Sequence, residues 1–311
     1  MLFFLNNAEN VAEHPNENYA RELMELHTIG VGSGYTEADV KNVARAFTGW
    51  TVNDDSAPGG FHFDPDSHDS DGKAVLGQSL PAGRGIEDGQ DVLSILANHP
   101  ATAAFVCRKL AVRFVSDAPP QSLLDAMVNV WNQSGGELKP VLKTLFLSPE
   151  FNAAVRQKLR RPLDFYVAAL RVTGRDIGKI GDAEGMLSNL SQIPYGWHAP
   201  NGSDVAGAWN NTSGLLNRWN TALALEVSTG KGHTATALVK SLGHVGTAGQ
   251  LVDAATQRVL MTTLPDNLRD SLIAYITDGG TADSPVTKDL LKNKVGVLFG
   301  LLLASDFFQW R

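Results

Sequence analysis

The densest group of ionisable side chains lies in Asn16–His27, a stretch with the periodicity of a helix. On a helix, Glu22 and Glu25 fall along one flank, so their two carboxylates can bind a single cation together. Arg21 stands four residues before Glu25, which is the spacing of a helical ion pair. His27 lies nearly opposite the two carboxylates and joins them only if the last turn of the helix unwinds. The pattern therefore has two interpretations: one wall of a metal site, or a salt-bridged helix with His27 near the C-terminal end of the helix dipole.

A second group of ionisable side chains forms an acidic loop, Asp64–Lys73. Together with Asp54 and Asp55 it places six aspartates in a short stretch, and carboxylates so close repel one another unless they are solvated or share a cation. Acids that alternate before a glycine resemble a calcium loop, although the expected bidentate glutamate is absent. His68 and Asp69 add an imidazole and a carboxylate, which suit zinc, manganese or iron. The loop is either a divalent-metal site or a solvated surface loop.

Two tryptophans, Trp197 and Trp209, mark a third candidate surface. Asn201 and Asn210 accompany them, and aromatic rings beside amides suit the binding of a sugar. His198 follows the first tryptophan directly, and it either lines a cleft or packs against the indole ring.

The composition of the chain excludes several classes of protein. A net charge of −7 over 311 residues argues against nucleic acid or an anionic membrane surface as the main partner, since both attract basic patches. No stretch reaches the roughly 18 uninterrupted apolar residues of a transmembrane helix, so membrane insertion is not expected. The single cysteine, Cys107, cannot form an internal disulfide or a thiolate zinc site. The N-terminus lacks the basic start and the longer apolar region of a signal peptide.

Helical periodicity dominates the chain and must position these side chains. It predicts an all-α fold, an irregular orthogonal multi-helical array in a single domain over residues 1–311, with a candidate sub-domain boundary near residues 176–182. Two long irregular loops interrupt the helices, Ile193–Ser213 and Val52–Gly77, and in the latter Phe61–Phe63 alternates as in a short strand. Helices are expected at residues 16–29, 36–48, 87–97, 102–115, 121–132, 137–147, 162–172, 183–190, 214–226, 235–242, 252–262, 267–277 and 286–304.

The second of these helices begins at Thr36, where Asp39 completes the spacing of a capping box. The acidic loop departs directly from this helix. We therefore expect the loop to fold back over the first helix, which would bring the helix carboxylates, or else His27, near His68 and Asp69.

Motifs along nearly the whole chain follow one recognisable pattern. They are Asn16–Thr28, Gly34–Val40, Ala44–Trp50, Phe61-x-Phe63, His68-Asp69-x-x-x-Lys73, Leu76-Gly77, His99–Ala103, Ser148–Phe151, Leu215–Arg218 and Leu302–Phe308. These motifs resemble the bacterial "domain of unknown function 1800" family. The resemblance implies no established reaction. It does imply that full-length relatives carry a further N-terminal stretch, often behind an export signal. Because that stretch is missing here, we expect either a homo-oligomer or an exposed apolar patch at Met1–Leu5.

The first functional hypothesis is a metal-dependent hydrolase that acts on phosphoesters of the phosphodiester or phosphotriester type, with a small-molecule ester as substrate. Glu22, Glu25, His68 and Asp69 would hold one or two divalent ions of zinc, manganese, iron or calcium. Such an ion lowers the pKa of a bound water and polarises the phosphoryl oxygen.

In this hypothesis Arg21 neutralises charge on the phosphoryl group and His27 relays a proton near neutral pH. The alternative is a non-enzymatic cell-envelope binding or assembly protein. It would hold a structural calcium and present an aromatic surface to a carbohydrate or a protein.

Overall fold

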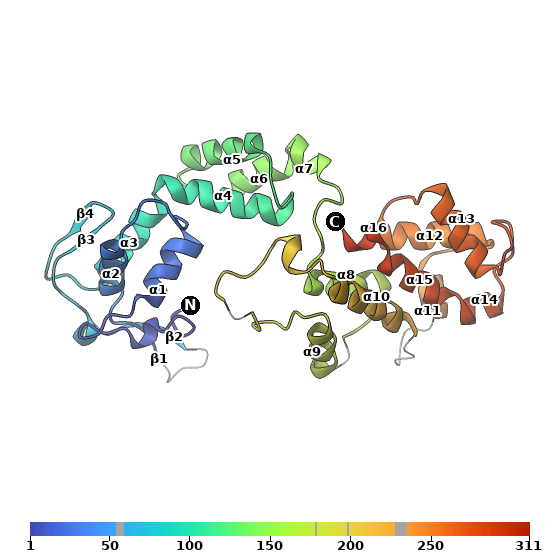
Figure 1. Cartoon of the computed structure of the whole chain (residues 1–311), viewed down its shortest axis with the longest axis horizontal. Coiled ribbons are helices and arrows are strands. Elements are labelled where there is room, and N and C mark those ends of the chain that lie inside the picture. The colour runs from blue at the N-terminus through green and yellow to red at the C-terminus, as the bar shows by residue number, and fades with distance from the viewer. Residues whose placement is uncertain (54–58, 178, 198, 228–234) are drawn as a thin grey trace. The chain divides into compact units, whose positions relative to one another are not determined.

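The computed structural model describes residues 1–53, 59–177, 179–197, 199–227 and 235–311 (Figure 1). Contacts divide the chain into two compact units, Met1–Ala153 (unit 1) and Ala154–Arg311 (unit 2). Within the described residues there are 16 α-helices and two small sheets of two strands, so the predicted all-α class is confirmed. The single domain, with its candidate boundary near residues 176–182, stays a prediction.

Unit 1 begins with helices and hairpins around an apolar core that includes the fully buried Met24, Phe47 and Leu96. The rings of Tyr19, Phe47 and Trp50 pack edge to face in a row, with centroids 5.1 and 5.0 Å apart. The helices of the unit are α1 (Glu17–Glu22), α2 (Glu37–Ala46), α3 (Ile86–Ala97), α4 (Pro100–Phe114), α5 (Gln121–Ser134), α6 (Leu138–Phe146) and α7 (Pro149–Ala153).

The helix predicted over residues 16–29 changes its geometry along its length. Asn16 caps α1, but the α-helix ends at Glu22 and continues as a π-helical turn, Leu23–His27. Two hydrogen bonds close this wider turn, from Thr28 Oγ1 to the carbonyl of Leu23 at 2.7 Å and from the Gly30 amide to that of Met24 at 3.0 Å. The periodicity therefore predicts the position of the helix correctly, but it does not predict that the last turn is π-helical.

Two antiparallel hairpins flank the acidic loop. Strands β1 (Trp50–Asn53) and β2 (Gly60–Phe63) pair first, which confirms the short strand expected at Phe61–Phe63. Strands β3 (Lys73–Val75) and β4 (Gln78–Leu80) form a second hairpin that the sequence did not predict. Its turn residue Leu76 has a positive φ of 50°, and its amide donates to Asp39 Oδ1 at 2.7 Å. A tertiary contact thus fixes a turn whose residues carry no strong hairpin signal.

The capping box at Thr36 is confirmed. The Thr36 hydroxyl accepts from the Asp39 amide at 3.2 Å, and the Asp39 carboxylate accepts from the Thr36 amide at 2.8 Å. The second carboxylate oxygen of Asp39 is the one that holds the β3–β4 turn, so one side chain both starts α2 and orients the hairpin beside it.

Unit 2 is built around the apolar helix α15, which packs against α10, α12 and α13. A Cβ at Gly300 of α15 would come within 2.9 Å of Leu223 Cδ2 on α10, so glycine permits the close approach of these two helices. The helices of the unit are α8 (Pro162–Thr173), α9 (Ile180–Asn189), α10 (Thr212–Val227), α11 (Ala235–Ser241), α12 (Ala248–Leu260), α13 (Asp266–Ile276), α14 (Lys288–Asn293), α15 (Val295–Ala304) and α16 (Asp306–Gln309).

The prediction of one helix over residues 286–304 is wrong. The structure has two helices, α14 and α15, that meet at Lys294. The Lys294 ammonium pairs with Asp278 Oδ1 at 2.6 Å and lies over the ring of Tyr275. Tyr275 lies in α13 and Asp278 follows that helix. The apolar pattern of residues 286–304 therefore does not predict these partners.

An isolated bridge between Leu159 and Trp310 joins the first and last segments of unit 2. Beside it the amide of Lys158 donates to the carbonyl of Arg311 at 3.1 Å, and Arg160 Nε donates to the carbonyl of Phe308 at 2.7 Å.

The largest fully buried side chain of the described residues belongs to Arg218 on α10. Its Nη1 donates to Gln309 Oε1 at 3.1 Å, and its guanidinium lies over the ring of Phe165. Burial lowers the pKa of Arg218 to about 10.

The N-terminal residues Met1, Phe3 and Phe4 are exposed, as the apolar patch expected at Met1–Leu5 requires, while Leu5 is buried. A homo-oligomer stays a prediction. Within the described residues, every helix is too short or too polar to cross a membrane.

We predict that Gly49→Ala destabilises unit 1 more than Gly77→Ala does. Both glycines have similar positive φ angles, 76° and 78°, so both substitutions carry the cost of a left-handed L-residue, about 1–2 kcal/mol. Only at Gly49 would the new Cβ meet backbone, since the Asp64 carbonyl oxygen would lie 2.3 Å away. We expect an additional loss of ~2 kcal/mol for Gly49→Ala in urea unfolding. Equal losses would contradict the close approach of Asp64.

Candidate functional site

Asp69, one of the predicted metal ligands, is bound by an arginine of α2. Arg45 Nε lies 2.6 Å from Asp69 Oδ2, and Nη2 donates to Oδ1 at 3.1 Å. Burial alone would raise the pKa of Asp69, but its hydrogen bonds to Arg45 and to the Asp71 amide keep this pKa below its ordinary value. A cation of the protein therefore satisfies the carboxylate that was expected to bind a metal.

A buried ion pair lies beneath the same loop. Lys73 Nζ is 2.7 Å from Asp88 Oδ2, and both side chains are almost completely enclosed. Lys73 also donates to the carbonyls of Asp69 and Asp71, so its ammonium binds both the loop and helix α3. Arg84 Nε lies 3.2 Å from the other oxygen of Asp88. Because charges leave water at a high cost, this pairing is what permits their burial.

His68 is also enclosed in this part of unit 1. Its Nδ1 donates to the carbonyl of Thr48 at 2.9 Å, and its Nε2 lies 3.5 Å from Asp88 Oδ2. The imidazole and the ring of Phe63 pack edge to face, with centroids 5.4 Å apart. These contacts fix the position of the ring within the protein interior.

The helix carboxylate Glu25 has partners of its own. Tyr35 donates its hydroxyl to Glu25 Oε1 at 2.5 Å, and Arg21 Nη1 lies 3.6 Å from the same oxygen. Arg21 further pairs with Glu37 at 2.7 Å and with Glu17 at 3.1 Å. The ion pair expected between Arg21 and Glu25 is present, and Glu17 and Glu37 are further partners of Arg21.

Glu22 and His27 remain as the other candidates of the first helix. The i to i+5 spacing of the π-helical turn moves His27 from the opposite side towards the side of Glu22. Burial and the charge of Glu25 raise the pKa of Glu22. Burial, Lys109 and the terminal amino group lower the pKa of His27. A lowered pKa favours the neutral imidazole, which is the form of histidine that can bind a metal ion.

The loop and the helix do not form a common ligand set. The loop bonds to α2, to α3 and, through Ser67, to Ala12, whereas Glu25 bonds to Arg21 and Tyr35. In the part of the chain that the structure describes, no three His, Cys, Asp or Glu side chains form a group that could hold a metal ion. Asp54 and Asp55 lie outside the described residues. The metal site and the roles of its residues stay predictions.

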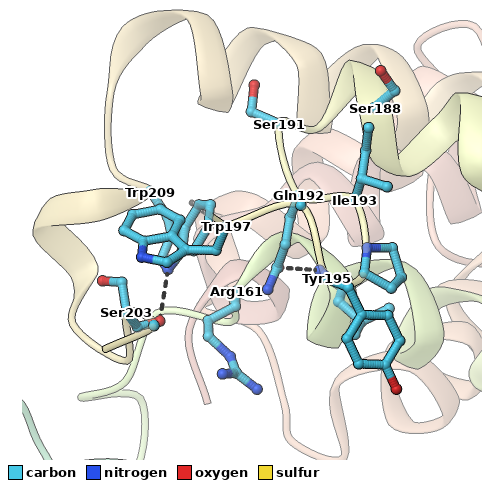
Figure 2. A pocket seen from close by; sticks show the side chains of 13 residues that line it. Arg161, Ser188, Ser191, Gln192, Ile193, Tyr195, Trp197, Ser203 and Trp209 are labelled. Carbon is cyan, nitrogen blue, oxygen red and sulfur yellow. Dashed lines mark hydrogen bonds between the residues drawn. The ribbon is translucent and has the colours of Figure 1, made fainter. Parts of the chain in front are cut away.

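Unit 2 contains a pocket at the third candidate surface, where Trp197 and Trp209 lie. It has a volume of about 530 Å³ and lies between the start of α8, the end of α9 and the irregular loop that follows (Figure 2). Its lining residues are Arg161, Leu163, Ser188, Ser191, Gln192, Ile193, Pro194, Tyr195, Gly196, Trp197, Gly202, Ser203 and Trp209.

The predicted pair Trp197 and Trp209 forms the aromatic wall of this pocket (Figure 2). The ring centroids are 5.5 Å apart at an angle of 55°. Trp209 is buried and donates its Nε1 to the carbonyl of Ser203 at 3.3 Å, while Trp197 is 44% exposed and donates to Asn201 Oδ1 at 3.0 Å. One indole is therefore a fixed support and the other is an open surface. His198 lies outside the described residues.

Gln192 anchors the loop to helix α8. Its Oε1 accepts the amide of Leu163 at 2.9 Å, which satisfies one of the unpaired amides at the start of this helix. The Gln192 side-chain nitrogen is left without a hydrogen-bond partner among the described residues, and so are the hydroxyls of Ser188 and Ser191. Sequence reasoning missed these residues because the cap and the helix are 29 positions apart.

Comparison with known proteins identifies the family of the chain. Residues 1–310 match the family described as "Protein of unknown function (DUF1800)", so the chain belongs to it. No curated protein and no solved structure matches the chain.

The buried ion pair provides a test of how the acidic loop is held. Lys73→Met should lower the free energy of unfolding by about 3 kcal/mol, because Asp88 then stays buried without its nearest cation. The double variant Lys73→Met/Asp88→Leu should recover most of this loss, since it removes both charges. The exposed Lys41→Met serves as a control, with an effect within about 0.5 kcal/mol. Urea unfolding measures all three, and a double variant as unstable as the single one would contradict the pairing.

Proposed function

We propose that this member of the DUF1800 family is a non-enzymatic binding protein whose unit 2 pocket takes a carbohydrate. The observation that supports this proposal most directly is the half-exposed Trp197 beside the buried Trp209. An exposed indole face offers a large apolar surface, and the apolar face of a pyranose ring can cover it. Exposed aromatic area inside a pocket is typical of ligand-binding sites.

The polar groups of the pocket suit the hydroxyls of a sugar. The Gln192 amide nitrogen is a donor, and the hydroxyls of Ser188 and Ser191 both donate and accept hydrogen bonds. Ser188 and Ser191 are exposed, so the hydroxyls of a sugar would replace water at these groups. All three residues belong to the lining of the pocket, as do the two indoles, and in Figure 2 the two serine hydroxyls point away from the rings.

Binding is favoured over glycoside cleavage by the residues that line the pocket. Hydrolysis of a glycosidic bond needs one protonated acid and one carboxylate at the scissile bond. Among the described lining residues there is no Asp, Glu or His. The neighbouring Asp164 and Asp204 both form ion pairs with Arg161.

Replacement of the open indole tests the proposal. Trp197→Ala should weaken the binding of oligosaccharides about tenfold, since an aromatic stacking contact contributes about 1.5 kcal/mol. The matched control is Trp219→Ala, because Trp219 of α10 is 45% exposed and does not line the pocket. The measurement is titration calorimetry with malto-, cello-, chito- and galacturono-oligosaccharides. If none of them binds the wild-type chain, the proposal is wrong.

Metal-dependent hydrolysis of phosphoesters stays a separate prediction, with its own measurement. Because Glu25 now bonds to Tyr35 and Arg21, we expect Glu25→Gln to leave bound metal and ester turnover unchanged and to cost at most about 1 kcal/mol of stability. Metal analysis and hydrolysis rates across an ester panel check this expectation. Loss of both metal and turnover in Glu25→Gln, and equally in His68→Ala, would restore the shared metal site.

A further inference from the structure

Tyr195 holds an aromatic ring in solvent at the rim of the unit 2 pocket. It belongs to the lining of the pocket, and among the described residues its side chain is the most exposed of the large apolar ones. Burial within the protein therefore does not explain why the ring stands there. An exposed aromatic side chain beside a cavity is typical of a group that makes its contacts with a ligand.

The backbone of Tyr195 is strained. The Gly196 amide donates to the carbonyl of Ile193 at 3.0 Å, which closes a β-turn with Pro194 and Tyr195 at its centre. Tyr195 has a φ of 60°, and because the proline ring fixes its own φ at about −65°, the turn is of type II. The third position of this turn favours glycine, since an L-residue with positive φ is strained. Here it carries a tyrosine, although a glycine occupies the next position.

The position of the ring is set before any ligand arrives. Gln192 bonds to the amide of Leu163 at 2.9 Å, so the chain is fixed to α8 directly before the turn. The turn then directs the side chain of Tyr195 into solvent. Backbone strain that the surrounding structure enforces concentrates at binding sites, and a ring held in place loses little freedom when a ligand covers it.

The pocket thus has aromatic rings on two sides. In Figure 2 the indoles of Trp197 and Trp209 lie on one side of Gln192, and the ring of Tyr195 lies on the other. Two peptide units separate Tyr195 from Trp197, so their Cα atoms are at most about 7 Å apart. A single sugar ring cannot cover both aromatic side chains when they point to different sides, whereas successive units of one chain can.

We infer that Tyr195 is a second stacking surface, and that the ligand of the pocket is a carbohydrate chain of at least two units. Trp197 takes one unit and Tyr195 takes a neighbouring one, with the phenol hydroxyl as an additional donor and acceptor. This inference rests on the proposed carbohydrate-binding function and adds the length of the ligand to it.

The experiment varies the length of one ligand. The oligosaccharide series of the panel that binds most tightly is titrated by calorimetry from the monosaccharide to the pentasaccharide. The wild-type chain should bind the longer members at least about tenfold more tightly than the monosaccharide, because they add a stacking contact. Tyr195→Gly should remove most of this gain and leave the affinity for the monosaccharide within about twofold of the wild-type value. Tyr195→Phe keeps the ring and should retain the gain.

The matched control is Met261→Gly. Met261 ends α12 with a φ of 54°, is exposed and lies outside the pocket, so glycine relieves a similar strain there without removing a lining side chain. Its affinities should equal those of the wild-type chain at every length. Both glycine variants should keep or raise the urea midpoint of unfolding, because glycine adopts a positive φ without strain.

The possible results separate this inference from the proposed function. If wild-type affinity does not rise with chain length, or if Tyr195→Gly weakens every length equally or none, the inference is overturned while carbohydrate binding stands. A lowered urea midpoint in Tyr195→Gly would show that the ring stabilises the fold, and it would overturn the inference as well. If no member of any series binds the wild-type chain, the proposed function fails and this inference fails with it.

Discussion

The ion pair between Lys73 and Asp88 is the contact on which the irregular part of unit 1 depends. It joins the start of β3 to helix α3, and Lys73 also binds the carbonyls of the loop before it. Buried charges of this kind are stable only as a set, because loss of one partner leaves the other uncompensated. Arg45 and Arg84 extend the same set outward to Asp69 and Asp88. The repulsion expected among the loop aspartates is thus relieved, at these positions, by cations of the protein.

Unit 2 also contains enclosed charges, and it provides partners for them in two other ways. Arg218 is enclosed with an amide oxygen of Gln309 and the ring of Phe165 beside it, and burial lowers its pKa. Arg161 is shared between Asp164 and Asp204, so its charge organises the wall of a pocket. A buried arginine beside an aromatic ring fixes the packing of helices, whereas one held between two carboxylates fixes a loop. Arg218 thus holds helix α10 to residues distant in sequence, and Arg161 holds a loop to α8.

Helical periodicity and capping signals predicted much of the fold, because each depends on residues close in sequence. The capping box at Thr36 is such a case. The break at Lys294 and the β3–β4 turn were missed, since each depends on an aspartate, Asp278 or Asp39, from a distant element. The site could be predicted only in part for the same reason. Spacing shows that carboxylates gather, but it does not show whether a metal ion or Arg45 will neutralise them. The two tryptophans were found as a pair, and their supporting groups were not.

The closure of unit 2 on itself has a consequence for the order of events during synthesis. Its first strand-like segment pairs with its last, and the contact between Arg160 and Phe308 spans 148 positions. On the ribosome, unit 2 cannot complete its core until residues 308–311 have emerged. Until then its apolar helices lack part of their packing. Unit 1 consists of residues 1–153, so all of its contacts can form before unit 2 has been synthesised. Domains generally fold as units, and the N-terminal domain folds first. The nascent chain therefore carries a folded unit 1 while unit 2 still lacks residues 308–311.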